Sequence, residues 1–559
     1  MLGTIPNILP MLSRRSFLTR ASLGAASATV VCAPHIARSA EELLTTPGQK
    51  PGRIIHIVSD GMSVGTLTCS DLFSQAHRDR GLTWVKLMSD PRTRLGLMNT
   101  RSLNSLVTDS AAASSAWGSG SRVTNGAINM IPDGRLLTPL YELFGQQKWG
   151  RGLVTTAEIT HATPAGFAAA IKSRDNAQLI AAQYLDRQVE VLLGGGKPFF
   201  DGSRRKDKRD LRGDFVAAGY TVVKDLAGLD LAPTDTRLLG TFADSHLPYT
   251  LDQMADPKLK ANVPTLAHMT RAALARLSQH NNFILQVEGA RVDHAAHNSD
   301  AAAAIRDQIA LDEAIDVCLE FQKQNPDTLI VITSDHGNSN LGINGMGGGY
   351  RQTPLRFKAL AEIKASYPEI LKRIQKVGEK IKVPSLGTDP EDKLDIPDPM
   401  AKVVPPGDED KDEEPKVNSG VQMASALQID PKAIADIIGE ATGYQMSARR
   451  AGLFAKVLGG EYQALYVQMN SVVSQLGQLM ANRVGVGWTG NTHTADYVQL
   501  LAIGPGSERF TGLLQNTDIF SHYTKLAGID FQNPSVPLLA ATDFDDAHDV
   551  ECSERYAWV

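Results

Sequence analysis

The sequence predicts an α/β fold: a large central, mostly parallel sheet flanked by helices on both faces, with a mainly helical insertion. Two observations predict it. Short runs of β-branched and apolar residues alternate along the chain with segments whose apolar residues recur at helical spacing. Of the 559 residues, 42% are hydrophobic and 21% charged, which is the balance of an ordinary folded protein. Strands that alternate with helices are typical of a parallel sheet covered on both sides.

The elements of the predicted sheet follow one another in a regular order. Strands are expected at residues 54–58, 153–156, 189–193, 283–287, 329–333 and 498–503, and helices at 263–278 and 301–321. In an open α/β sheet, ligands bind beyond the carboxyl ends of the strands. The functional residues are therefore expected at the ends of these runs.

The first forty residues predict an export signal rather than part of the fold. Ser13-Arg14-Arg15-Ser16-Phe17-Leu18 is a twin-arginine pattern, a weakly apolar run covers residues 21–33, and small residues at 37–40 suit cleavage. We expect a periplasmic or secreted protein that leaves the cytoplasm by the twin-arginine route.

Beyond the signal, the sequence divides into a core interrupted by an insertion. Residues 41–350 are expected to form the first part of the α/β core, and residues 484–559 its second part with a C-terminal tail. Residues 351–483 are expected to be inserted between them, helical at 359–381, 431–455 and 461–483, with a proline-rich acidic loop at 384–416. A cap over the site, a dimer contact and a surface crown are all compatible with this insertion.

Charge and hydropathy exclude several classes of partner. Outside the N-terminus, the chain has no uncharged apolar run long enough to span a bilayer as a helix. The net charge of −5 gives no reason to expect a nucleic-acid-binding surface. A small-molecule ligand fits this composition, and the chain is compatible with a homodimer.

Acidic and histidine side chains follow four of the predicted strands. Asp60, His161 with Thr163, Glu288, and Asp335 with His336 each come directly after one of these runs. A single such residue is more often a turn or N-cap residue than a ligand. Several buried charges at one sheet edge, however, would repel one another unless cations neutralised them. The sequence therefore predicts a metal centre at this edge.

The residue types narrow the choice of metal. Imidazole together with carboxylate suits zinc, and carboxylate together with hydroxyl suits magnesium. Asp293 and His297 are four residues apart, so on a helical turn both would project from one face toward one ion. This spacing alone is a weak signal, because short motifs often mislead.

A candidate nucleophile begins an alanine-rich helix. Ser110 follows Asp109, a residue type that caps helices, and the backbone N–H groups of the first turn would face an anion. Without the neighbouring metal residues, a capped helix packed through small residues would be the better interpretation. Arg174 offers a planar fork for phosphate oxygens, although a single arginine is more often a surface ion pair.

Six motifs, in order along the chain, resemble those of the alkaline phosphatase family. They are Ser59-Asp60-Gly61-Met62, the region Val107 to Trp117 around Asp109-Ser110-Ala111, Gln286-Val287-Glu288-Gly289, Asp293-His294-x-x-His297, Ser334-Asp335-His336 and Asn491-Thr492-His493-Thr494. The resemblance covers about residues 52–350 and 484–525. It implies a large, mostly parallel sheet flanked by helices, which is the fold already expected from the pattern.

The resemblance also implies a role for each matched residue. Ser110 would become phosphorylated, Arg174 would clamp two phosphate oxygens, and Asp109 would orient Arg174. Two zinc ions and one magnesium ion would be bound, the first zinc by Asp293, His297 and His493, the second by Asp60, Asp335 and His336, and magnesium by Asp60, Thr163 and Glu288. The implied function is hydrolysis of phosphate monoesters.

Two positions differ from a common bacterial pattern of that family. His161 stands where many bacterial members have Asp, and His294 where they have Lys. Both are expected beside the magnesium and phosphate sites, as substrate-binding or supporting residues. His161 either contacts the water shell of the third metal or is structural, and the identity of that metal stays open.

Two other functions use the same residues. A phosphodiesterase would keep the metals and Ser110, but a diester has one fewer anionic oxygen for Arg174 to clamp. A non-catalytic phosphate-binding protein would be expected to lack the nucleophile or a metal ligand, and the sequence has all of them. Hydrolysis of phosphate monoesters is therefore the leading prediction.

Overall fold

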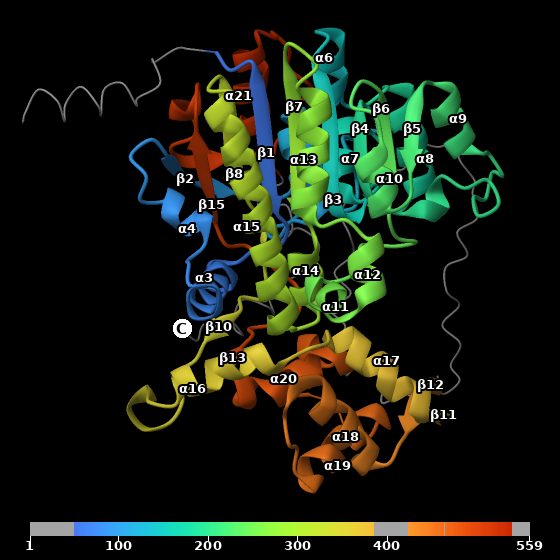
Figure 1. Ribbon diagram of the computed structural model, residues 1–559, viewed down its shortest axis with the longest axis vertical. Helices are drawn as coiled ribbons and strands as arrows, with labels where there is room; N and C mark the ends of the chain where they lie inside the picture. Colours follow the sequence, from blue (N-terminus) through green and yellow to red (C-terminus); the bar gives the residue numbers. More distant parts are fainter. Residues whose placement is uncertain (1–49, 385–422, 463, 539–559) are drawn as a thin grey trace, which may run out of the picture. The chain divides into compact units, whose positions relative to one another are not determined.

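The computed structural model describes residues 50–384, 423–462 and 464–538, and its central feature is a ten-stranded sheet (Figure 1). The sheet has the order β16-β2-β15-β8-β1-β7-β3-β4-β6-β5. Strand β15 pairs antiparallel with both β8 and β2, and the other pairings in this sheet are parallel. The prediction of a mostly parallel sheet is confirmed. The expected export signal at 1–40 and the acidic loop at 385–416 lie outside the described residues.

Four adjacent strands form the centre of this sheet. They are β8 (Thr328–Thr333), β1 (Arg53–Ser59), β7 (Phe283–Gly289) and β3 (Gly150–Glu158). Their apolar residues are buried on both faces, because Ile55 and Ile57 pack into one hydrophobic cluster while Ile54 and Val58 pack into another. Continuous apolar runs are what a parallel sheet covered on both sides requires.

The outer strands include several that the sequence did not predict. β4 (Val191–Gly195) and β15 (Val498–Ile503) were expected, whereas β2 (Arg94–Asn99), β5 (Tyr220–Val223), β6 (Arg237–Thr241) and β16 (Gly512–Gln515) were not. These strands are short, and the apolar residues Leu95 and Leu97 of β2 are about half exposed. They lack the continuous apolar pattern that marks a central strand.

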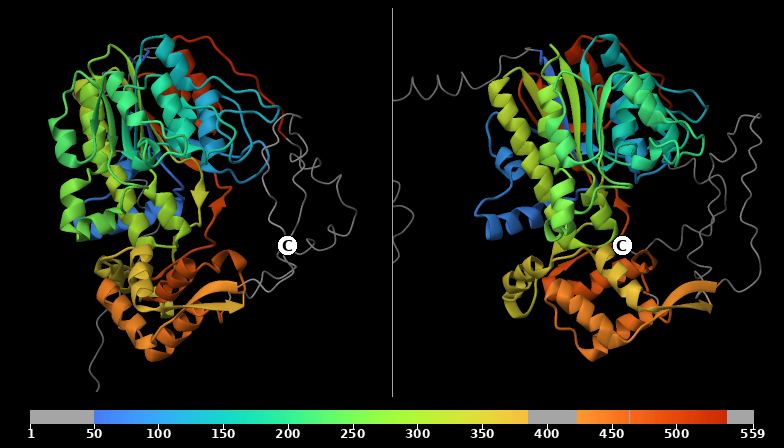
Figure 2. Two further views of the ribbon diagram at one scale, coloured as in Figure 1. Left: turned by 90° about the vertical axis from the view of Figure 1, so that its right-hand side faces the viewer. Right: turned by 45° about the vertical axis from the view of Figure 1, so that its right-hand side comes forward.

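Helices cover both faces of the sheet (Figure 2). α13 (Leu266–Leu277) and α15 (Ala301–Gln324) pack on one face against β3, β7, β1 and β8, and α6 (Leu140–Gln146) and α7 (Ala162–Ala168) contact β3 from the other. Between residues 50 and 300, the other α-helices are α3 (Val64–Arg78), α4 (Thr83–Leu87), α5 (Ser110–Ser119), α8 (Ala177–Asp186), α9 (Leu211–Ala217), α10 (Leu226–Leu231), α11 (Thr250–Ala255), α12 (Pro257–Asn262) and α14 (Arg291–His297). The chain continues after β16 with α21 (Asp518–Ala527). None of the helices in the described part of the chain is long and apolar enough to span a membrane.

Residues 342–487 leave and rejoin the core through a pair of short strands. β10 (Gly342–Ile343) pairs antiparallel with β13 (Val486–Gly487). Between them lie α16 (Thr353–Lys358), α17 (Tyr367–Val377), β11 (Glu379–Pro384), β12 (Met423–Gln428), α18 (Pro431–Thr442), α19 (Ala448–Leu458) and α20 (Val472–Val484), with 3₁₀ turns at Gly348–Tyr350, Ala359–Glu362 and Val467–Met469.

Both predicted ends of the helix at 359–381 are wrong. Ser366 caps a new helix through the N–H of Glu369, and Pro368 lies in its first turn, so α17 begins only at Tyr367. Gly378 ends it, and the residues that follow pair with β12 in an antiparallel ribbon. The helix expected at 431–455 is also interrupted, because Gly443 ends α18 with φ +67°. The helix expected at 461–483 begins later, at Val472, after the cap residue Ser471.

Two carboxylates attach α17 to the core, the fully buried Asp300 and the half-buried Asp252. Asp252 accepts hydrogen bonds from the N–H and the hydroxyl of Ser366, at 2.8 and 2.7 Å, and Asp300 accepts one from the N–H of Tyr367 at 2.7 Å. Asp300 also caps α15 through the N–H of Ala303. Burial raises the pKa of Asp300 to about 7.

Helices α5 and α7 pack closely because glycines meet at their contact. A Cβ on Gly118 would lie 1.9 Å from the carbonyl oxygen of Gly166. We predict that Gly118→Ala lowers the free energy of unfolding by about 1–3 kcal/mol, because the helices must separate to admit the methyl group. Gly452→Ala in α19 is the matched control, since nothing lies within 4 Å of its Cβ position. Urea denaturation that finds Gly118→Ala as stable as the control would contradict this packing account.

The buried Asp300 predicts a defined pH dependence. The pKa of Asp300 is raised from 3.8 to about 7, so its stabilising contribution is complete below about pH 4 and is lost as the pH rises through 7. We predict that the stability of the native chain relative to Asp300→Asn falls between about pH 4 and 7, by a few kcal/mol, and is constant above that range. Urea denaturation of both proteins across this range measures the difference. A difference that does not change with pH would contradict the prediction.

Candidate metal and phosphate site

The carboxyl ends of the four central strands bring the expected site residues together. Asp60 follows β1, Glu288 lies at the end of β7, Asp335 and His336 follow β8, and His161 and Thr163 follow β3. α14 adds Asp293 and His297 directly after β7. Three groups of these side chains have ligand atoms within 4.8 Å of one another: Asp293 with His297 and His493, Asp60 with Asp335 and His336, and Asp60 with His161 and Glu288.

His493 comes from a distant part of the sequence. It lies in β14 (His493–Thr494), which pairs antiparallel with β9 (Gly337–Asn338), directly after His336. The ring of His493 stacks on that of His336, with centroids 3.6 Å apart. This short ribbon brings the end of the insertion back to the site.

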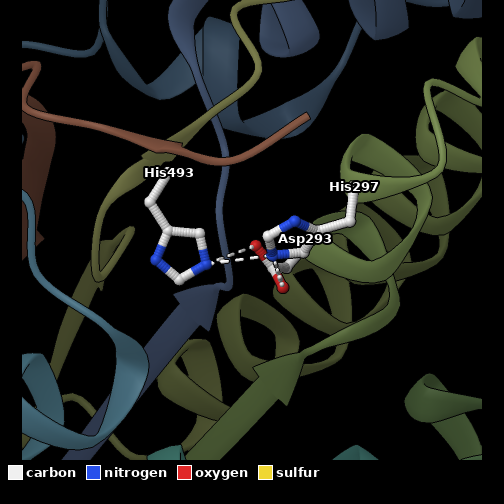
Figure 3. Close-up of side chains that lie close together, drawn as sticks. All are labelled: Asp293, His297 and His493. Carbon is white, nitrogen blue, oxygen red and sulfur yellow. Dashed lines mark hydrogen bonds and ion pairs between the residues drawn. The ribbon is translucent and has the colours of Figure 1, made fainter. Parts of the chain in front are cut away.

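The first group has its nitrogen lone pairs directed at one point (Figure 3). His297 donates from Nδ1 to the carbonyl oxygen of Asn491 at 2.6 Å, and His493 donates from Nδ1 to that of Thr108 at 2.8 Å. Carbonyl oxygens only accept, so in each neutral ring Nε2 carries the lone pair. The two Nε2 atoms are 3.0 Å apart. That of His297 lies 3.3 Å from Asp293 Oδ2, and that of His493 lies 3.6 Å from Asp293 Oδ1.

Two lone pairs and a carboxylate facing one another require a cation between them. The pKa values reflect this need. Burial opposes charge on Asp293, but His297 and His493 outweigh it and lower the pKa of Asp293 well below its usual range. Burial likewise opposes charge on His297, yet Asp293 raises its pKa to about 9, while burial and His336 lower the pKa of His493 to about 4.

The second group lies deeper, and its three side chains are fully buried. His336 Nε2 is 3.1 Å from Asp335 Oδ2 and 3.5 Å from Asp60 Oδ1, and it is 3.2 Å from Ser110 Oγ. Both carboxylate oxygens of Asp60 lack a hydrogen-bond partner. Burial, and next the charges of Asp335 and Asp293, raise the pKa of Asp60 well above its usual range.

Gly61 lets these carboxylates approach. It adopts φ +66°, and a Cβ there would lie 2.4 Å from Asp293 Oδ1. Its N–H donates to Asp335 Oδ1 at 3.0 Å. A side chain at this position would force the strand ends apart.

The third group comprises Asp60, His161 and Glu288, and Thr163 lies beside Glu288. Thr155 donates to Glu288 Oε2 at 2.5 Å, whereas Glu288 Oε1 and the hydroxyl of Thr163 are buried without a hydrogen-bond partner. Burial raises the pKa of Glu288 to about 7. Across the three groups, unpartnered carboxylate oxygens and the Thr163 hydroxyl lie beside imidazole nitrogens, and divalent metal ions bind this set of donor atoms.

Ser110 contacts the second group, and Arg174 is bound to the residue before Ser110. Ser110 is the first residue of α5, whose N-cap Asp109 accepts from the N–H of Ala112 at 2.8 Å. Asp109 Oδ2 accepts a hydrogen bond from Arg174 Nη1 at 3.0 Å and one from the N–H of Gly126. Asp109, which the resemblance expects to orient Arg174, is thus hydrogen-bonded to it.

His161 holds the other arm of Arg174. Arg174 Nη2 donates to His161 Nε2 at 3.1 Å, so in the neutral ring the proton of His161 lies on Nδ1. Burial, and next the charge of Arg174, lower the pKa of His161 well below its usual range. The guanidinium is therefore fixed on both sides.

Sequence reasoning missed several supporting residues. His246, from the loop after β6, lies with its ring centroid 4.3 Å from that of His294, whose Nδ1 accepts from Arg291 at 2.8 Å. Asn338 donates to Asp293 Oδ1 at 2.6 Å. No local pattern points to His246, whereas Arg291 and Asn338 each lie within two residues of a predicted ligand.

Comparison with known proteins supports the same conclusion. The family model described as alkaline phosphatase matches residues 52–529. Alkaline phosphatase 4 of Bacillus subtilis is 31% identical over 476 residues, which cover 83% of this chain and 86% of that protein. The crystal structure of Thermus thermophilus alkaline phosphatase superposes with a TM-score of 0.74 at 29% identity, covering 93% of this chain and all of that one.

A second solved structure agrees with the first. The cold-active alkaline phosphatase of the psychrophile Shewanella sp. matches with a TM-score of 0.63 and 26% identity, covering 85% of this chain and 99% of that one. The metal-binding groups, the serine beside them and the family match together identify the chain as a member of the alkaline phosphatase family, and thereby as a phosphoric monoester hydrolase.

Proposed function

We propose that the chain is an exported alkaline phosphatase that hydrolyses phosphate monoesters through a phosphoserine at Ser110, with two zinc ions and one magnesium ion. The observation that carries this proposal is the contact of Ser110 Oγ, 3.2 Å from His336 Nε2, with a second histidine ring stacked on His336. A serine at the edge of a polymetal donor set is placed for nucleophilic attack on phosphorus.

The donor types support the choice of metals. Asp293, His297 and His493 would hold one zinc ion, and Asp60, Asp335 and His336 the other, because imidazole with carboxylate suits zinc. Asp60, Glu288 and Thr163 would hold magnesium, which prefers oxygen ligands. When bound, these divalent ions neutralise the phosphate dianion and lower the pKa of the hydroxyl groups that react.

The residues of the chain carry the remaining steps. Arg174 holds two non-bridging oxygens of the phosphoryl group, in a position fixed by Asp109 and His161. Ser110 Oγ attacks phosphorus, the ester oxygen leaves as the alcohol, and the phosphoryl group is transferred to Ser110. Water then attacks the phosphoserine from the opposite side, which releases inorganic phosphate and restores the Ser110 hydroxyl.

Three further features support export, a preference for monoesters, and turnover. The twin-arginine pattern at residues 13–18 supports export, since that route carries proteins already folded around their cofactors. Arg174 favours monoesters over diesters, because a diester has one fewer anionic oxygen. A phosphate-binding protein without turnover would not need Ser110 beside the donor groups.

Replacement of the nucleophile is the first test. We predict that Ser110→Ala lowers kcat/KM for p-nitrophenyl phosphate by about a thousandfold or more, because the covalent route is lost. Ser105→Ala is the control, since the hydroxyl of this serine accepts a hydrogen bond from the N–H of Val107 in the loop before α5. Acid quenching of the native enzyme with substrate, followed by mass spectrometry, is expected to find phosphate on Ser110. Unchanged turnover in Ser110→Ala, or a preference for bis-p-nitrophenyl phosphate in the native protein, would overturn the proposal.

Replacement of Arg174 tests phosphate binding separately from attack. We predict that Arg174→Ala raises KM for p-nitrophenyl phosphate and the inhibition constant of inorganic phosphate by about ten- to a hundredfold, because two charge-assisted hydrogen bonds are lost. Arg187→Ala, which removes an arginine paired with Glu142 away from the site, serves as the control. Equal inhibition constants in the two variants would show that Arg174 does not bind phosphate.

A further inference from the structure

A segment of the insertion covers the loop that carries His493. Thr492 donates from its hydroxyl to Gln468 Oε1 at 2.9 Å, and the hydroxyl of Tyr466 donates to the same oxygen at 3.3 Å. A Cβ on Gly490 would lie 3.3 Å from the Tyr466 hydroxyl and 3.9 Å from its Cε1 atom. Tyr466 therefore lies against the backbone of this loop.

The same loop is part of the site. The carbonyl oxygen of Asn491 accepts the Nδ1–H of His297, and Thr492 directly precedes His493. The side chain of His297 is 37% exposed, so solvent reaches the first group of ligands. Gln468 contacts the residue before His493, and Tyr466 contacts Gln468.

Tyr466 and its neighbour present apolar surface to solvent. Tyr466 is 52% exposed and Leu465 is fully exposed, although both belong to residue types that are usually buried. On another segment, Leu106 is 68% exposed four residues before Ser110. The carbonyl oxygen of Thr108, between Leu106 and Ser110, accepts the Nδ1–H of His493. Exposed apolar side chains therefore lie on two segments, one of which contacts His493 and the other the residue before it.

The phosphate-binding groups cannot distinguish one monoester from another. Arg174 and the ligand groups hold the phosphoryl part, which every monoester shares. Discrimination must come from side chains that meet the alcohol part of the substrate. An aromatic ring held at its hydroxyl end, with about half of its surface exposed, offers a stacking surface at little cost in side-chain entropy.

We propose that Tyr466, supported by Leu465 and Leu106, contacts the alcohol part of the substrate and favours monophosphate esters of aromatic or other apolar alcohols. This inference rests on the proposed phosphomonoesterase function and adds its substrate class. Gln468 is the positioning residue that fixes the hydroxyl end of Tyr466 to the loop of His493.

The test compares two esters that differ only in the alcohol. kcat/KM is measured for 1-naphthyl phosphate and for methyl phosphate with the full-length, metal-loaded enzyme. We expect Tyr466→Ala to lower kcat/KM for naphthyl phosphate about three- to tenfold and to leave methyl phosphate unchanged. Tyr466→Phe keeps the ring and is expected to keep the preference. Tyr350→Ala, which removes another exposed tyrosine, is the control and is expected to change neither ester.

Two results would overturn the inference. Equal losses for both esters in Tyr466→Ala would show that the ring only positions the loop of His493, and no loss for either would show that it meets no substrate. Failure of the proposed function is distinguishable, because the native enzyme would then hydrolyse neither ester. In that case, calorimetric binding of naphthylmethylphosphonate and methylphosphonate to the native protein and to Tyr466→Ala still decides whether Tyr466 contacts the organic group.

Discussion

Four carboxylates converge at the carboxyl edge of the central strands, and the rest of the site depends on neutralising them. Asp60, Glu288 and Asp335 are fully buried and Asp293 is 4% exposed, yet the described part of the chain places no lysine or arginine in an ion pair with any of them. Charges so buried and so close repel strongly unless cations lie between them. The histidines of these groups supply imidazole nitrogens as ligands, and the metal ions of the family supply the positive charge.

Local backbone geometry makes this convergence possible. Gly61 allows the end of β1 to approach Asp293, and the glycines between α5 and α7 bring Ser110 and Thr163 to the same edge. The β9–β14 ribbon returns the chain from the insertion and stacks His493 on His336. Asp252 and Asp300 attach the insertion to the core. Its segment at 464–470 contacts the loop that carries His493, through the hydrogen bond of Thr492 to Gln468.

The sequence predicts the parts of the molecule whose physical signal is local. Continuous apolar runs predict the central strands, and the polar residues at their ends predict the metal groups. The outer strands β2 and β16 were missed because half-exposed strands lack such runs. The prediction of one long helix at 359–381 was wrong, because the N-cap at Ser366 and the end of the helix at Gly378 outweigh the apolar spacing of the segment. His246 was missed because its contact with His294 depends on the tertiary fold alone.

Metal content together with thermal stability tests the central claim most directly. The purified mature chain is analysed by inductively coupled plasma mass spectrometry, and its thermal midpoint is measured before and after dialysis against a chelator. The account predicts two zinc ions and one magnesium ion per chain, a marked fall in the midpoint on chelation, and recovery when both metals are restored. A chain without bound divalent ions that unfolds at the same temperature with and without chelator would contradict it.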